Sequence, residues 1–189
     1  MTVHEKQDDG TIKEVYKVTG GPYGGMKVNC QFESLLDEMF GGQKLYDYRA
    51  QFPSDWLKIM NDFEAKKRGA RALERKETRI RLPLSFISFT NDFRSASLKR
   101  YRYGEVRILN DEYLCLSSRV MKKLFEPVLE AMKDHLKALL SNQQLSKVKV
   151  MLLVGGFADS PLLQDEIKTA FTRYKHKSKR GLTIGYHAC

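Results

Sequence analysis

The nearly continuous apolar run from Val148 to Val154 constrains the fold of this chain more than any other feature. A run of this length and composition predicts a strand that is buried on both faces, as in a parallel sheet. Gly155 and Gly156 then break the strand, and Ser160 and Pro161 supply the cap and first residue of a helix. A helix, a buried strand, a glycine turn and a helix in succession indicate an α/β fold, whose ligands bind at the carboxyl ends of strands.

Hydrophobic periodicity and turn residues predict the other elements. The expected strands lie at residues 2–5, 12–18 and 79–84, and residues 91–105 are expected to form a variable loop or ribbon. The expected helices are capped by Asn29, Ser54 and Ser117, and Gly41-Gly42 ends the first of them. Pro127 is expected to end the helix that Ser117 opens and to start another, because proline fits a first turn but not a helix interior.

Composition narrows the classes of protein to consider. With 189 residues and 42% hydrophobic content, the chain can bury a core as one domain. Its apolar stretches are too short to span a membrane and its first residues lack a signal-peptide pattern, so we expect a cytoplasmic protein of the cytosol or nucleus. Three cysteines and four histidines are scattered, which predicts reduced thiols and no metal site.

The formal charge of +10 is concentrated locally. Residues 64–81 carry eight basic and three acidic side chains, and residues 173–180 carry five basic side chains and no acid. Solvated helix faces and a loose tail explain such clusters, although they can also attract a phosphate-bearing ligand or nucleic acid. Basic and aromatic residues interleave at 99–103, but nucleic-acid binding without a recognised scaffold is disfavoured.

The Gly155-Gly156 turn is the first candidate binding site from the residues alone. Two glycines let the backbone pass against a nucleoside, and the amides of the following helix point the same way. The turn lacks the third glycine of a dinucleotide fingerprint and the Lys-Ser/Thr of a P-loop. Tight packing of strand and helix explains a bare Gly-Gly turn as well as a ligand does.

The segment 148–164, with its Gly-Gly-Phe-Ala-acid-Ser turn, resembles the adenosine-binding segment of the seventy-kilodalton heat-shock proteins, in the form of their divergent twelve-A and twelve-B branch. The glycine turn at 20–25, the Glu-x-x-Lys-Arg helix at 63–68 and the strand at 82–87 resemble the same branch in order and spacing. The resemblance covers residues 2–171 and implies an actin-like (ribonuclease H-like) ATPase fold, second lobe only. The core lobe would comprise residues 1–40 and 110–189, with an inserted subdomain at 41–109.

The resemblance implies a site for ATP or ADP between two walls. Gly155, Gly156 and Phe157 would line the adenosine on the first wall. Asp159 stands where the typical family motif has an arginine that stacks on adenine, so we expect the adenine to be held more weakly or differently.

The second wall would come from the helix and glycine turn earlier in the chain. By the same resemblance, Lys67 and Arg68 would flank the base and ribose, and Glu64 would accept from ribose hydroxyls. Gly24 and Gly25 would approach the phosphates through main-chain N–H groups. A guanidinium can stack on adenine while a lysine holds a hydroxyl or phosphate. An exposed helix face remains the simpler explanation of these basic residues when the resemblance is set aside.

Hydrolysis is not expected of this chain alone. Gly21, Met26 and Lys27 replace the carboxylates of the typical glycine motif, and the sequence contains neither the first lobe nor its phosphate loops. Phosphoryl transfer depends on positioning with metal and cationic stabilisation, so we expect no catalytic residue here, and Mg²⁺ only together with the first lobe.

Two functions therefore stay open. The first is an adenine-nucleotide-binding fragment of a heat-shock-type chaperone ATPase domain. The alternative is a non-catalytic protein-interaction module that keeps the fold but not the nucleotide site, which Asp159 and the replaced carboxylates favour. Both allow protein partners or clients, and neither requires a membrane.

Overall fold

A computed structural model describes residues 1–71, 76–91, 105–145, 148, 150–177 and 183–187. Its elements, in chain order, are β1 (Val3–Lys6), β2 (Ile12–Tyr16), α1 (Gly25–Phe40), α2 (Gly42–Gln51), α3 (Pro53–Arg68), β3 (Thr78–Arg81), α4 (Leu84–Phe89), β4 (Val106–Leu109), β5 (Tyr113–Leu116), α6 (Ser118–Leu140), a 3₁₀ turn (Gln143–Leu145), β6 (Val150–Val154), α7 (Pro161–Lys177) and β7 (Thr183–His187). The chain is α/β, as expected. Among these elements, no helix combines the length and apolarity needed to cross a membrane.

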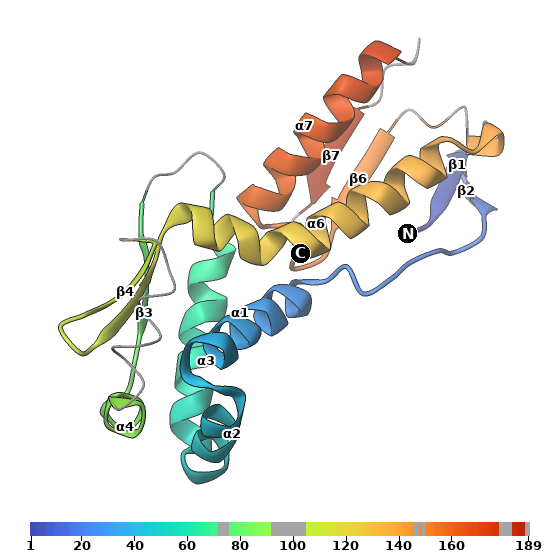
Figure 1. Cartoon of the computed structure of the whole chain (residues 1–189). Coiled ribbons are helices and arrows are strands. Elements are labelled where there is room, and N and C mark those ends of the chain that lie inside the picture. Colours follow the sequence, from blue (N-terminus) through green and yellow to red (C-terminus); the bar gives the residue numbers. More distant parts are fainter. Residues whose placement is uncertain (72–75, 92–104, 146–147, 149, 178–182, 188–189) are drawn as a thin grey trace.

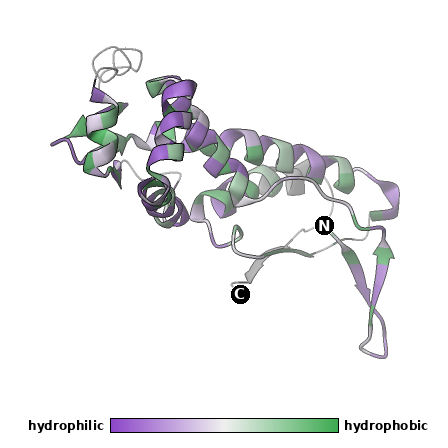
Figure 2. Ribbon diagram, turned by 90° about the horizontal axis from the view of Figure 1, so that it is seen from below, coloured by the Kyte–Doolittle hydropathy of each residue, from purple (hydrophilic) through white to green (hydrophobic). Residues whose placement is uncertain are grey.

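Helix α6 connects two groups of elements (Figure 1). One group contains α1, α2 and α3 with the sheet β3-β5-β4, and the other contains α7 and the parallel pair β6-β7. Helix α6 contacts α1 on one side and α7 on the other. The hairpin β1-β2 projects away from the helices (Figure 2). Its Asp-Gly turn forms as expected, with Gly10 at φ +86°.

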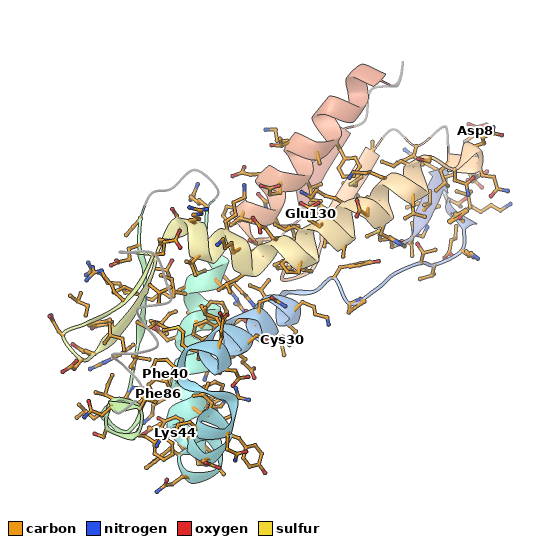
Figure 3. All side chains as sticks on the ribbon, in the orientation of Figure 1. Asp8, Cys30, Phe40, Lys44, Phe86 and Glu130 are labelled. Carbon is orange, nitrogen blue, oxygen red and sulfur yellow. The ribbon has the colours of Figure 1, made fainter. Side chains whose placement is uncertain are left out.

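The core lies between the helices. It includes six fully buried aromatic side chains, five on α1, α3, α4 and α6 and one on α2: Phe32, Phe40, Phe63, Phe86, Phe125 and Tyr48. The rings of Phe40 and Phe86 meet edge to face with centroids 5.2 Å apart, where α1 faces α4 (Figure 3). Such contacts add to the burial of apolar area, and they fix α1, α2 and α4 relative to one another.

Two of the predicted helix caps are wrong. Helix α1 begins at Gly25, so Asn29 lies inside the helix, where it is buried and bonded to α3. Helix α3 begins at Pro53 with Phe52 as its cap, and Ser54 follows the first residue. In both cases the helix begins before the proposed cap, and in α3 Pro53 fits the first helical position. Ser117 does cap α6, since its hydroxyl accepts from the Val120 N–H at 3.2 Å.

Pro127 does not divide the helix that Ser117 opens, because α6 runs unbroken from Ser118 to Leu140. A proline inside a helix removes one hydrogen bond and costs about 3 kcal/mol. The apolar stripe that begins with Val120 continues through Val128 and Leu136, and all three are buried. Burial of one continuous stripe outweighs the local cost of proline.

The strand expected at 82–87 is also wrong, because helix α4 occupies most of that segment. Pro83 is extended and its carbonyl accepts from the Phe86 N–H at 3.0 Å, which starts the helix. The strand expected at 79–84 is shorter, as β3, and lies at the edge of its sheet. Strands β4, β5 and β7 and helix α2 were not predicted. Residues 92–104, with the basic and aromatic cluster at 99–103, and residues 178–180 of the basic tail lie outside the described residues.

Strand β6 is not buried on both faces as expected. Val150, Leu152 and Val154 are 56%, 65% and 65% exposed. Met151 and Leu153, on the opposite face, pack against the core. Only one face of this strand is therefore covered by the described residues, and an apolar stripe remains open on the other.

Candidate functional site

Three segments that are distant in sequence meet at the start of α1. A Cβ atom added to Gly25 would lie 3.2 Å from the Nζ atom of Lys67, on α3, and 3.3 Å from the Cδ2 atom of Phe157, after β6. These distances are tighter than ordinary van der Waals contact, so a side chain at Gly25 would displace one of the two neighbours. The structure thus brings together a residue from each of the three motifs that the sequence singled out.

Lys67 is the centre of this arrangement and is 4% exposed. Its ammonium donates to the Gly25 carbonyl at 3.0 Å, to the Asn29 amide oxygen at 2.7 Å and to the Glu64 carboxylate at 2.5 Å. An ammonium has three protons, and all three have acceptors here. Lys67 therefore fastens the glycine turn to α3, and contact with a ligand would require it to release one of these bonds.

Asn29 also belongs to this site, although the sequence predicted it to be a helix cap. Its amide nitrogen donates to Glu64 at 2.9 Å while its amide oxygen accepts from Lys67. A signal for it was present, because Asn29 falls on the same helical face as Phe32 and Leu36, which are core residues. A polar side chain on an apolar face needs a buried partner.

Glu64 and Arg68 form the solvent-facing side of the cluster. The Arg68 side chain is 71% exposed and its Nε atom donates to Glu64 at 3.3 Å. Burial raises the pKa of the Glu64 carboxyl, but hydrogen bonds from Lys67 and Asn29 outweigh burial and hold that pKa below its ordinary value. Glu64 is thus an ionised acceptor at neutral pH, beside an accessible planar cation.

The turn after β6 depends on Gly155, whose φ is +94°, a conformation that side chains disfavour. The Gly155 carbonyl accepts from the Ala158 N–H at 2.8 Å, which closes the turn. As predicted, Ser160 caps α7, since its hydroxyl accepts from the Leu163 N–H at 3.5 Å. The Leu162 N–H donates to the Ala70 carbonyl at 3.2 Å, which ties the start of α7 to the end of α3.

The remaining candidate residues occupy different surroundings. The ring of Phe157 stacks on Phe125 of α6, with centroids 6.1 Å apart. Asp159 is exposed on the same turn. Gly24 is the extended cap of α1, next to Gly25. A Cβ atom added to Gly24 or Gly156 would meet no atom within 4 Å, so packing within the protein does not explain the glycine at either position.

Comparison with known proteins gives the same family as the sequence motifs. The chain is 37% identical over 176 residues to mouse heat shock 70 kDa protein 12A, and 36% identical over 176 residues to the human protein of that name. It is 37% identical over 175 residues to human heat shock 70 kDa protein 12B. Each match covers 90% of this chain and 26% of the relative.

No family model and no solved structure matches the chain. The chain spans about a quarter of the length of the relatives it matches. These matches identify it as a relative of the heat shock 70 kDa protein 12A and 12B branch, corresponding to part of those proteins.

Proposed function

We propose that this chain forms the adenosine-binding part of a heat-shock-type ATPase domain and does not hydrolyse ATP on its own. In this proposal it corresponds to the second lobe of an actin-like fold, with a core lobe at 1–40 and 110–189 and an inserted subdomain at 41–109. The relatives' family name supports a nucleotide-binding domain, and the motif resemblance assigns the residues.

The observation that carries the proposal is the meeting of Gly25, Lys67 and Phe157. The resemblance assigned these residues to the phosphates, the ribose and base, and the adenosine. Gly25 and Phe157 lie 42 and 90 positions from Lys67 along the chain, and folding brings all three within contact distance. A site whose parts converge is a better candidate than a motif on one loop.

The exposed groups at this junction fit an adenosine. Glu64 is an ionised acceptor for ribose hydroxyls, and the exposed Arg68 guanidinium can stack on the base. Gly156 and Gly24 leave open backbone that a ligand can approach. Lys67 has a positioning role in this site, because its protons hold Gly25, Asn29 and Glu64 in place.

The phosphate end of the site lacks carboxylates that the typical family motif has. Met26 and Lys27 stand where the typical motif has carboxylates that could position water or a cation. ATP and ADP would therefore bind chiefly through the adenosine, and Mg²⁺ would contribute only when the first lobe of such a domain is supplied. We expect adenosine, ADP and ATP to bind with similar affinity, since the nucleoside carries the recognition.

Isothermal titration of the folded chain with adenosine, ADP and ATP tests the proposal. Arg68→Ala should weaken binding about tenfold, the loss of one stacked cation. Lys58→Ala is the matched control, because Lys58 lies on the same helix, is also 71% exposed and also pairs with a carboxylate. Absence of adenosine-dependent heat in a chain that circular dichroism shows to be folded would remove the claim of binding.

The second candidate is a non-catalytic protein-interaction module, which the open apolar face of β6 favours. Unpaired apolar stripes on soluble proteins commonly mark contact surfaces. In this case a partner would be retained equally with and without ATP, and Leu152→Ser would weaken retention. Leu57→Ser is the control, since Leu57 is 58% exposed on α3. Retention that depends on ATP would argue against this candidate.

A further inference from the structure

An open groove of about 710 Å³ lies between the end of α3, strand β3 and the start of α6. Its described lining residues include none of those assigned to the adenosine site. Ala65, Lys66 and Gly69 of the α3 end line the groove, whereas Glu64 and Lys67 form the cluster at Gly25. These two sets point to different sides of one helix because successive residues are turned by about 100°.

The groove carries a strong positive charge. Among the described residues, four basic side chains line it, namely Lys66, Arg71, Lys76 and Arg79, with a single acid, Glu77. That acid is already occupied, because Arg107 binds its carboxylate with two hydrogen bonds of 3.0 Å.

The basic side chains of the groove are only weakly neutralised. Lys66 lies 3.9 Å from Asp62, at the limit of an ion pair, and Arg79 shares Glu77 with Arg107. Within the described part of the chain, Arg71 and Lys76 have no ion-pair partner. Like charges that gather around one groove repel one another, and a bound anion would relieve that repulsion.

The start of α6 adds to the same potential. Ser118, its first residue, lines the groove, and the first turn contains no acidic residue. The first amides of a 23-residue helix carry a partial positive charge that attracts anions. The Ser117 hydroxyl accepts from only one of these amides, that of Val120. The helix therefore supports the four side chains as a second source of positive charge.

We propose that this groove binds a compact, soluble polyanion with two or more phosphate groups. Four cations around a space of this size suit several negative charges better than one. The described lining residues include no aromatic side chain on which bases could stack, which disfavours single-stranded nucleic acid. They include no exposed large apolar side chain that could enter a bilayer, which disfavours a membrane surface.

Inorganic tripolyphosphate is the probe, titrated calorimetrically into the whole chain at low salt. We expect saturable binding with one site, weakened by added NaCl because the charges are exposed. Arg71→Gln/Lys76→Gln should weaken binding at least about tenfold, since two charge-assisted contacts are removed. Lys58→Gln/Lys137→Gln is the control with the same loss of charge, because both lysines are exposed on helices outside the groove.

The outcomes separate this site from the adenosine site. Binding of tripolyphosphate that Arg71→Gln/Lys76→Gln weakens and the control double variant retains supports the groove, even if adenosine itself does not bind. Displacement by adenosine would place the phosphate at the nucleotide site and overturn the proposal. Equal weakening in the two double variants would show diffuse attraction to a basic protein, and absence of binding at low salt would end the proposal directly.

Discussion

Replacement of Lys67 by methionine tests the role that the structure gives this residue. Lys67→Met keeps most of the unbranched stem of the side chain but removes three hydrogen bonds, leaving the Gly25 carbonyl, the Asn29 amide oxygen and Glu64 without this donor. Breaking a buried pair costs about 3–5 kcal/mol. Glu64 is 32% exposed and can recover water, so we expect a loss of about 2–3 kcal/mol.

Urea unfolding at pH 7, followed by circular dichroism, measures this loss. With a denaturant slope of about 2 kcal/mol per molar, the midpoint should fall by about 1–1.5 M. Lys66→Met is the control on the adjacent residue, whose half-exposed side chain makes only a 3.9 Å ion pair. It should cost at most about 0.5 kcal/mol. If both variants unfold at the same urea concentration, the buried network does not stabilise the junction.

A double-mutant cycle with Asn29→Ala extends the test to the network itself. Asn29 bonds both Lys67 and Glu64, so its loss and the loss of Lys67 remove shared contacts. We expect the double variant to be more stable than the sum of the single losses implies, by about 1 kcal/mol. Strict additivity would show that the two side chains act independently.

Three further predictions concern the turn after β6 and the contact between α6 and α7. Gly155→Ala should destabilise the chain by about 1–3 kcal/mol, because the φ of Gly155 is +94°. Gly156→Ala should change the stability by under about 0.5 kcal/mol, because an added Cβ atom there meets no atom within 4 Å. Urea unfolding of the two variants measures both changes. Asp159→Arg should raise the affinity for adenosine about fivefold, because it adds a cation that can stack on the base. Calorimetry should compare it with Asp159→Asn, which only removes the negative charge, and an equal effect of the two variants would refute stacking. A hydrogen bond from Lys122 lowers the pKa of the Glu166 carboxyl. The ionised Glu166 therefore stabilises the fold above the ordinary carboxyl pKa, and this stabilisation is lost as pH falls through the lowered pKa. Glu166→Gln should therefore cost about 1 kcal/mol at pH 7 and much less near pH 3 in urea unfolding, and an equal cost at both pH values would contradict this cause.

Local sequence signals were accurate where the physical cause is local. Asp-Gly at residues 9–10 formed the hairpin turn, and the caps at Ser117 and Ser160 formed as expected. These signals work because a turn or a cap involves atoms only a few residues apart. The glycine after Phe40 likewise ended α1, with Gly41 at φ +85°.

Predictions failed where tertiary packing outweighed a local preference. Pro127 stays inside α6 because the apolar stripe on both sides of it is buried against the same core. Asn29 was read as a cap from its type alone, although its partners lie 35 and 38 residues away on α3. The helical face of Asn29 indicated that it needed a buried partner, but no pattern within a short window identifies which distant residue that partner is.

The sequence by itself determined the family, the α/β class and the identity of the motifs, because each depends on residue types at fixed spacings. Tertiary structure alone decided which of those residues meet, and what they do on meeting. It placed Lys67 in a saturated buried network instead of an open ligand contact, and it left one face of β6 exposed. Burial and the number of free protons on a charged group are properties of the assembled neighbours, which a linear pattern does not contain.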